Sequence, residues 1–455
     1  MNSKSFVSQN LVFAATQTFS TQILISLISF GSSIILARAL GPEGRGAFAL
    51  LVTILSVITT FGNLGLHISN VYHGASDRSS VADLTRNSLT IAVFVGIVLV
   101  TGGIVLSYVS PVSNFLEANL IAQPMLWMVL GLVPFSLLSL YLASILLGCG
   151  HIHRYNWVNV GQPAFQLVFL ILFLAVFQQG LVASITAYML ATLGSTVITI
   201  YWVRQLTPVK FGLERGLLKK SLIYGVKANI GHIAQFLNYR FDMFLVAYFL
   251  GPAAVGFYAI AVGLAEKLWM IPSAIGTVLF PTVSAVGELK ANALTPKVAR
   301  HTTLLVALLA LGLVFLAHPL IVGVFGSEFA PSVLPFLLLL PGVVALSIGK
   351  VLANDLAGRG KPEYWTIGAW ASLGMTIALD LVLIPRWGIA GAAISSSLSY
   401  GLLSLIVLAA FKRMTRISFR DLLTMKNSDV HAYRRLFDEA IEKARAWRMA
   451  QGKRL

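Results

Sequence analysis

Charged residues are scarce in this chain. Asp, Glu, Lys and Arg together make up 11% of its 455 residues, whereas apolar residues make up 57%. A soluble domain has about 25% charged residues, so this composition excludes an ordinary water-soluble fold. It predicts helices that lie in a lipid bilayer.

Cysteine and catalytic motifs are nearly absent too. The single cysteine, Cys149, excludes an internal disulfide and any CxxC motif. His151 and His153 have no Cys or carboxylate cluster nearby, and no phosphate-binding Gly-Lys-Ser/Thr loop occurs. We therefore expect no metal, no cofactor and no enzymatic activity. A membrane-embedded glycosyltransferase or polysaccharide polymerase, which would need a large loop, is the less favoured alternative.

Long apolar segments are what the chain has in abundance. Segments of about 20 residues or more can cross about 30 Å of hydrocarbon. We identify twelve: 11–37, 46–70, 88–109, 124–148, 157–178, 181–203, 222–249, 256–283, 302–325, 332–356, 364–384 and 389–411. Each is continuously apolar, without the alternation of a membrane β-strand, so we expect helices.

Two short motifs occur twice in the chain at one offset. Leu40-Gly41-Pro42 returns 210 residues later as Leu250-Gly251-Pro252. Gly148-Cys149-Gly150 is matched in the same register by Gly358-Arg359-Gly360. The two pairs indicate an internal duplication. In a membrane protein, such halves are typical of a transporter with its site at their interface.

Each half contains six segments, an even number, so both halves enter the membrane from the same side. The repeat axis then runs along the membrane normal, as in transporters with parallel repeats. We predict an all-α membrane protein with twelve transmembrane helices in two six-helix bundles related by a pseudo-twofold axis. The bundles are 1–203 and 222–411, and a basic cytoplasmic linker, 204–221, joins them.

The loops indicate the orientation, because Lys and Arg favour the cytoplasm. With the N-terminus inside, the outer loops hold only Arg38, Arg45 and Arg386. The inner connections hold Lys4, Arg78, Arg86, Arg154, Arg204, Lys210, Arg215, Lys219, Lys220, Lys290, Lys297, Arg300, Arg359 and Lys361. We expect a multi-pass protein of the cytoplasmic (inner) membrane with both termini in the cytoplasm. The net charge of +16 follows from this bias and from the tail, and it does not indicate nucleic-acid binding.

The tail, 412–455, differs in composition from the rest of the chain. It contains twelve Lys or Arg residues against five acids. Apolar residues with a three-four spacing predict an amphipathic helix; they are Tyr433, Leu436, Phe437, Ala440, Ile441 and Ala444. Such a helix either forms a solvated cap or binds anionic lipid or a partner enzyme.

Charges within the apolar segments are expensive in a membrane and therefore indicate function. The second half contains Lys227, Arg240, Asp242, Glu266, Lys267, Lys350, Asp355 and Asp380, and the first half has almost none. At about 1.5 Å per residue, Arg240 lies roughly 15 Å from the turn at Gly251, and Lys267 lies roughly 24 Å from it on the next helix. These charges therefore reach similar depths in the membrane.

Two interpretations of these charges are open. Arg240 and Lys267 either line a cavity or pair with Asp242 and Glu266 as a structural clamp. Residues two apart on a helix point in different directions, which argues against a direct pair between Arg240 and Asp242.

The remaining charges lie nearer the ends of their segments. Lys227 either belongs to the cavity or extends to the lipid headgroups. For Lys350, Asp355 and Asp380 we expect interfacial positions or helix pairing.

Small polar residues form a stripe along the first segment. Thr18, Gln22, Ser26, Ser29 and Ser33 recur at spacings of three and four, which places them on one helix face. Such a stripe either packs helices together or lines a cavity. We predict that Gln22, Ser26 and Ser29 line a polar cavity together with Asn238.

The second half resembles that of the bacterial polysaccharide flippases (Wzx-type). The matching stretches are NYRFD at 238–242, LGPAAVGFY at 250–258, EKLW at 266–269 and PSAIGTVLFP at 272–281. These flippases belong to the multidrug/oligosaccharidyl-lipid/polysaccharide exporter superfamily. The resemblance spans about residues 8–411 and leaves the tail uncovered.

The resemblance implies a substrate: an oligosaccharide repeat unit on undecaprenyl pyrophosphate, flipped to the outer leaflet for O-antigen, capsule or exopolysaccharide synthesis. Arg240 and Lys267, with Lys227, would supply the counter-charge for the pyrophosphate, and Arg suits phosphate oxygens through its planar fork. The sugars would occupy the polar cavity and the polyprenyl tail would stay in lipid. Membrane lipids, and a polysaccharide polymerase or glycosyltransferases of the same pathway, are the expected partners.

Ion coupling is expected from the same resemblance. Glu266 and Asp242 are the candidate coupling residues, because burial can raise the pKa of a carboxylate toward neutrality. Transport driven by the membrane potential alone is the alternative.

Two related functions compete with this one. A multidrug antiporter for organic cations needs acidic residues in its cavity, and the helices of the first half have none. A lipid II flippase shares the pyrophosphate but usually has additional helices and more Arg in its first half.

Overall fold

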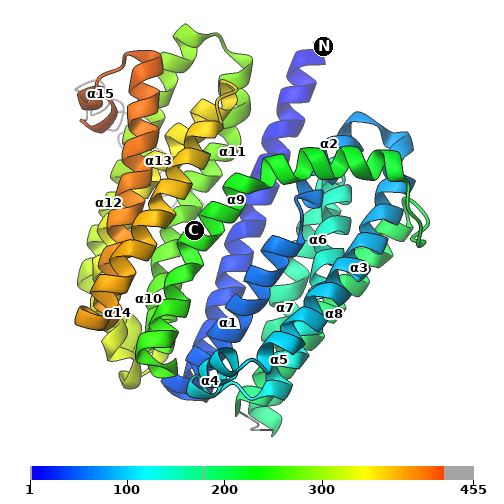
Figure 1. Ribbon diagram of the computed structural model, residues 1–455. Helices are drawn as coiled ribbons and strands as arrows, with labels where there is room; N and C mark the ends of the chain where they lie inside the picture. Colours follow the sequence, from blue (N-terminus) through cyan, green and yellow to red (C-terminus); the bar gives the residue numbers. More distant parts are fainter. Residues whose placement is uncertain (1–2, 178–179, 425–455) are drawn as a thin grey trace, which may run out of the picture.

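The computed structural model of this protein describes the backbone of residues 3–177 and 180–424. It describes the side chains of residues 17–174, 180–422 and 424. The described residues form helices joined by short loops (Figure 1). The first half contains α1 (Ser3–Gly62), α2 (Leu66–Ser76), η1 (Arg78–Ser80), α3 (Val81–Ser107), α4 (Ser110–Ala118), α5 (Gln123–Leu130), α6 (Val133–Gly148), α7 (Ile152–Phe177) and α8 (Gly180–Arg204). The second half contains α9 (Arg215–Leu250), α10 (Pro252–Ala265), η2 (Glu266–Trp269), α11 (Met270–Ala285), α12 (Glu288–Phe325), η3 (Ser327–Ser332), α13 (Val333–Gly358), α14 (Glu363–Thr415) and α15 (Phe419–Leu423).

The protein is a multi-pass membrane protein. Within the described residues, nine helical stretches are long and apolar enough to cross a bilayer. Two of them, in α1 and α14, are broken inside by a glycine in the left-handed region, Gly41 with φ 63° and Gly388 with φ 59°. Large apolar side chains such as Phe315, which is 76% exposed, cover the outside of the helices. A lipid environment accommodates such a surface, whereas water does not.

Several predicted segments differ at their ends or are interrupted. The segment predicted at 46–70 is broken at Asn63–Gly65, because Leu64 and Gly65 have positive φ angles of 52° and 73°. The one at 256–283 is interrupted by the 3-10 turn η2. The predicted linker, 204–221, is irregular only up to Glu214, whose side chain caps the first turn of α9. The predicted amphipathic helix of the tail lies outside the described residues.

The two copies of the repeated motifs have the same backbone conformation. Gly41 has φ 63° and ψ −176°, and Gly251 has φ 82° and ψ −175°. Gly150 and Gly360 both have φ 77°. Gly150 and Gly360 end their helices with the same two hydrogen bonds. In each, the N–H of the glycine and the N–H of the next residue donate to carbonyls of the last turn. Glycine is required at these positions because other residues strain in this region.

The helices form two groups that α9 connects. In Figure 1, α2 to α8 lie on one side and α10 to α14 on the other, and α9 crosses from the first group to the second. The N-terminal end of α1, the beginning of α9 and α15 lie at the upper end of this view. Contacts between the groups run mainly from α1 to α10, from α1 to α9 and from α2 to α9.

Candidate substrate cavity

A cavity of about 520 Å³ lies between the two halves. From the first half it is lined by Ser56, Thr59, Thr60, Asn63, His67 and Leu140, and from α9 by Asn229, His232, Gln235, Phe236 and Tyr239. Apart from two apolar positions, these side chains are polar or amphipathic. Helices α1, α2 and α6 therefore provide one wall, and α9 provides the other.

Arg240 and Glu266 form a two-pronged ion pair at the edge of this cavity. The guanidinium nitrogens of Arg240 donate to the two carboxylate oxygens of Glu266 at 2.7 and 3.1 Å. One of them also donates to the carbonyl oxygen of Tyr239, a cavity residue, at 2.9 Å. Both side chains remain partly accessible, at 29% and 21%. In this state Glu266 neutralises the charge of Arg240, as in the clamp interpretation.

Lys350 lies deeper in the protein than its sequence position indicates. We expected an interfacial position or helix pairing, but its ammonium lies 5.0 Å from the ring centre of Trp269 and 5.8 Å from that of Tyr239. Tyr400 packs against both rings, at 5.4 and 5.7 Å. A cation over the face of an aromatic ring is attracted by the negative potential of that face. The sequence contained the lysine, but only the fold brings the rings of Tyr239 and Trp269 to it.

The other two predicted cations lie in different surroundings. Lys267 is half-buried in η2, directly after Glu266, and its Nζ has no carboxylate partner among the described residues. Lys227 is exposed on α9. The structure therefore groups Arg240, Lys267 and Lys350 around η2, and it leaves Lys227 apart.

Asp242 and Asp380 are buried inside the second half. Asp242 accepts hydrogen bonds from Tyr258 at 2.6 Å and from Ser396 at 3.2 Å, and it is 1% exposed. Asp380 is fully buried, and among the described residues neither of its carboxylate oxygens has a hydrogen-bond partner. The expected interfacial or paired position of Asp380 was therefore wrong.

The polar residues predicted for the cavity are placed elsewhere. Asn238 is fully buried and joins α9 to α14, because its side chain bonds to Ser372 at 2.9 Å and to Thr376 at 2.7 Å. Gln22, Ser26 and Ser29 are on α1, and none of them is among the residues that line the three cavities described here.

Asp355 has a structural position, as the helix-pairing interpretation expected. It accepts a hydrogen bond from Thr295 at 2.5 Å and pairs with Arg359 at 2.5 Å. Asp355 is fully buried. Its hydrogen bond with Thr295 joins α12 to the end of α13.

A second cavity, of about 350 Å³, lies within the first half. It shares Ser56, Thr59 and His67 with the central cavity, so the two adjoin. Side chains of α6, α7 and α8 complete its wall. The sequence does not indicate this space, since hydroxyl residues on four different helices have no common spacing.

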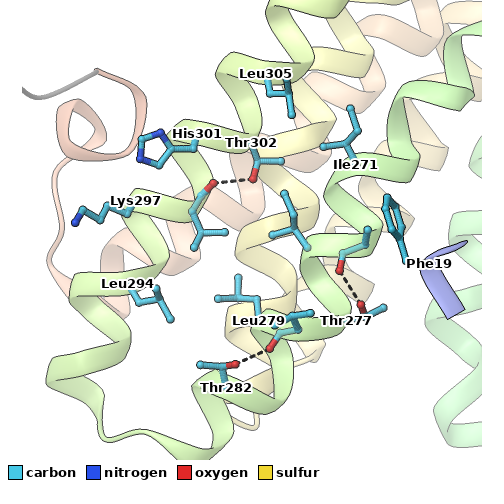
Figure 2. Close-up of a pocket in the computed structure, with 14 residues that line it drawn as sticks. Phe19, Ile271, Thr277, Leu279, Thr282, Leu294, Lys297, His301, Thr302 and Leu305 are labelled. Carbon is cyan, nitrogen blue, oxygen red and sulfur yellow. Dashed lines mark hydrogen bonds between the residues drawn. The ribbon is translucent and has the colours of Figure 1, made fainter. Parts of the chain in front are cut away.

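The largest of the three cavities, of about 1130 Å³, is an apolar groove between α11 and α12. Figure 2 shows Ile271 and Leu279 on one side, Leu294 and Leu305 on the other, and Phe19 of α1 reaching toward them. Its threonines donate to carbonyls of their own helices, so they leave few polar groups in the groove. Lys297 and His301 lie at its edge on α12.

These features define a class of protein. Two helical halves enclose a polar cavity with cations at its edge, and an apolar groove runs along the second half. This is the arrangement of a membrane transporter built from repeated halves, with its site between them.

Comparison with known proteins identifies the family of this chain. Residues 14–286 match the family described as polysaccharide biosynthesis protein, and the chain belongs to that family. A protein of Shigella flexneri that is named as an O-antigen transporter is 24% identical over 412 residues, which cover 86% of this chain and 95% of that protein. The succinoglycan biosynthesis transport protein ExoT of Rhizobium meliloti is 26% identical over 73% of this chain and 66% of its own length. The resemblance to the polysaccharide flippases is confirmed.

Solved structures with a similar fold include a lipid II flippase and a multidrug resistance transporter. The lipid II flippase MurJ, in an inward closed conformation, superposes with a TM-score of 0.70 over 89% of this chain and 88% of its own, at 14% identity. An inward-facing multidrug resistance transporter of the MATE family gives 0.69 over 88% and 98%, at 16% identity. At these identities the likeness concerns the fold.

Proposed function

We propose that this protein flips an oligosaccharide repeat unit, linked to undecaprenyl pyrophosphate, from the cytoplasmic to the outer leaflet. The observation that carries the proposal is the group of three cations, Arg240, Lys267 and Lys350, around η2. The pyrophosphate is the one strongly charged part of such a lipid. Anions cross a region of low dielectric only if counter-charges accompany them, and these cations provide them.

The ion pair between Arg240 and Glu266 suggests how the phosphate is received. The planar fork of Arg240 now holds a carboxylate at 2.7 and 3.1 Å, and the same fork fits two phosphate oxygens. The pyrophosphate displaces Glu266 from Arg240, and Lys350 contributes its unpaired charge.

The glycan and the polyprenyl tail of the substrate match the central cavity and the apolar groove. The glycan occupies the central cavity and its polar wall in the first half. The polyprenyl tail lies along the apolar groove between α11 and α12, whose lining is mostly apolar and offers few polar atoms. An amphipathic substrate is thereby divided among surfaces of matching polarity.

Alternating access requires two bodies that move against each other. We propose twelve membrane spans: the nine apolar stretches, of which those in α1 and α14 each count twice because Gly41 and Gly388 break them, and α9 as the twelfth. They form two six-helix bundles, 1–203 and 222–411, related by an axis along the membrane normal. The bias of Lys and Arg toward the inner loops supports a cytoplasmic position of both termini, and we propose the inner membrane as the location of the protein. A polymerase or glycosyltransferases of the pathway are its expected partners.

The buried acids of the second half provide a candidate for ion coupling. Asp380 is fully buried on α14, and Ser396 of the same helix donates a hydrogen bond to Asp242 at 3.2 Å. Two carboxylates in a buried site cannot both stay charged without a cation. A proton or a sodium ion taken up from outside would fill this need. Asp242, Asp380 and Glu266 are the proposed coupling residues.

The test uses purified protein in liposomes that contain an undecaprenyl-pyrophosphate-linked glycan. The wild type should expose the glycan to an impermeant reagent, and the variant with both Arg240→Ala and Lys267→Ala should lose most of this rate. A variant with Lys219→Ala and Lys220→Ala also removes two cations, but from the exposed beginning of α9, and it should flip at the wild-type rate. Retained flipping in the first variant, at equal protein level, would contradict the site.

A further inference from the structure

The cavity within the first half has a hydrogen-bonding character that differs from that of the central site. Five hydroxyl side chains along it use their single hydrogen on a backbone carbonyl: Ser56, Thr59, Ser144, Thr192 and Ser195. A hydroxyl has one hydrogen to donate and two lone pairs. These residues therefore present lone pairs, and few hydrogens, to a molecule in the cavity.

Two amides add to this acceptor surface. The side-chain nitrogen of Asn159 donates to the carbonyl of Tyr155 at 2.9 Å. That of Gln162 donates to the hydroxyl of Thr192 at 3.3 Å. Each amide thus commits an N–H to the protein, and its oxygen remains an acceptor for a ligand.

The wall has no formal charge. Among the described residues that line this cavity, none is Asp, Glu, Lys or Arg. A carboxylate or phosphate there would have no cation to pair with, which is unfavourable in a buried site. An uncharged hydroxyl group, in contrast, can donate its hydrogen to each of these acceptors.

The rest of the lining is apolar and aromatic. Leu55, Leu140 and Leu147 lie among the polar residues, together with Tyr155 and Tyr188. A sugar ring has hydroxyls at its rim and C–H groups on its faces, so it matches a wall of acceptors and apolar patches. The volume of about 350 Å³ is at the small end of ligand pockets, which suits part of a glycan.

We propose that this cavity is a subsite for uncharged sugar units of the transported glycan and that it disfavours units with a carboxylate. The inference rests on the proposed flippase function and adds the class of sugar. The cations at η2 take the pyrophosphate, and the first half selects the glycan by offering acceptors. The two halves thereby recognise chemically different ends of one headgroup.

The test compares three polyprenyl-pyrophosphate probes in liposomes with the purified protein. One carries a neutral disaccharide, one carries the same disaccharide with a hexuronic acid, and one carries no sugar. The wild type should flip the neutral glycan at least about tenfold faster than the acidic one, because an unpaired buried charge costs more than one hydrogen bond. Thr192→Val and Gln162→Met should each slow the neutral glycan about fivefold, and slow the probe without sugar less.

Thr186 provides a matched control. It also donates to the carbonyl four residues before it on α8, but it does not line the cavity, so Thr186→Val should keep the wild-type rates. Gln162→Lys keeps the proposal testable if the loss variants fold poorly, because a cation there should move the preference toward the acidic glycan. Size-exclusion profiles check that each variant folds.

The outcomes separate the two levels of the argument. Equal wild-type rates for the neutral and acidic glycans, or identical effects of Thr192→Val and Thr186→Val, would overturn the subsite and leave the flippase function in place. Failure of the wild type to flip any probe would overturn the flippase function, and the subsite would fall with it.

Discussion

Gly46 and Gly256 pack against each other, backbone to backbone, across the boundary between the halves. A Cβ atom added to Gly46 would lie 1.8 Å from the carbonyl oxygen of Pro252, and one added to Gly256 would lie 2.0 Å from that of Pro42. The two glycines occupy equivalent positions in the two halves, 210 residues apart. The duplicated motif therefore forms the contact that joins the two copies.

The first prediction concerns this contact. Gly256→Ala should lower stability by about 1–3 kcal/mol, because the backbone of α1 must move to accept the methyl group. Gly263→Ala, on the same helix, is the matched control, since a Cβ there has no atom within 4 Å; it should leave stability unchanged or raise it slightly. Thermal unfolding in detergent measures both. An equal unfolding temperature for the two variants would contradict the close contact.

The second prediction concerns the shape of the Arg240 side chain. Arg240→Lys keeps the charge but loses the planar fork, so flipping of the lipid-linked glycan should fall at least about tenfold. Arg386→Lys makes the same change at an exposed position and should have no effect. Liposome flipping assays at equal protein level decide the matter. A wild-type rate in Arg240→Lys would indicate that Arg240 acts only through its charge.

The third prediction separates binding from stability at Lys350. Lys350→Met removes the ammonium from the faces of Trp269 and Tyr239, and flipping should fall about tenfold. Lys350→Arg keeps a cation over the rings and should retain more activity. The rate per folded molecule, compared with the unfolding temperature, distinguishes the roles. A lower unfolding temperature with an unchanged rate would make Lys350 a structural residue.

The fourth prediction concerns the energy source. Asp380→Asn keeps the shape of a buried side chain but removes its charge, so an imposed proton or sodium gradient should no longer accelerate flipping. Flipping without a gradient should continue, because the cations at η2 are intact. Glu266→Gln should alter both, since it releases Arg240 as well. An undiminished response to the gradient in Asp380→Asn would remove Asp380 from the coupling site.

The sequence was sufficient for those features that depend on one segment at a time. Continuous apolar runs predicted the membrane helices, because each span satisfies its own backbone hydrogen bonds. The repeated motifs predicted two related halves, and the matching conformations of Gly41 and Gly251 agree with that duplication. The breaks at Gly65 and at η2 escaped notice, since apolar composition says little about local backbone angles.

The candidate site was predictable in part. Arg240, Glu266 and Lys267 were recognised because charge within an apolar run is rare and costly. For Lys350 and Asp380, the distance from a helix end does not predict burial. The surroundings of Lys350 come from other segments: the ring of Tyr239 on α9 and that of Trp269 on η2.

By itself, the sequence determined the membrane location, the duplication, the family and the list of charges available for a site. Only the tertiary structure decided which charges meet, which carboxylate neutralises Arg240, and that hydroxyls of the first half surround a cavity. The physical reason is that hydrophobicity and helix formation are properties of neighbouring residues. Pairing, burial and cavity shape arise where helices distant in the chain pack together.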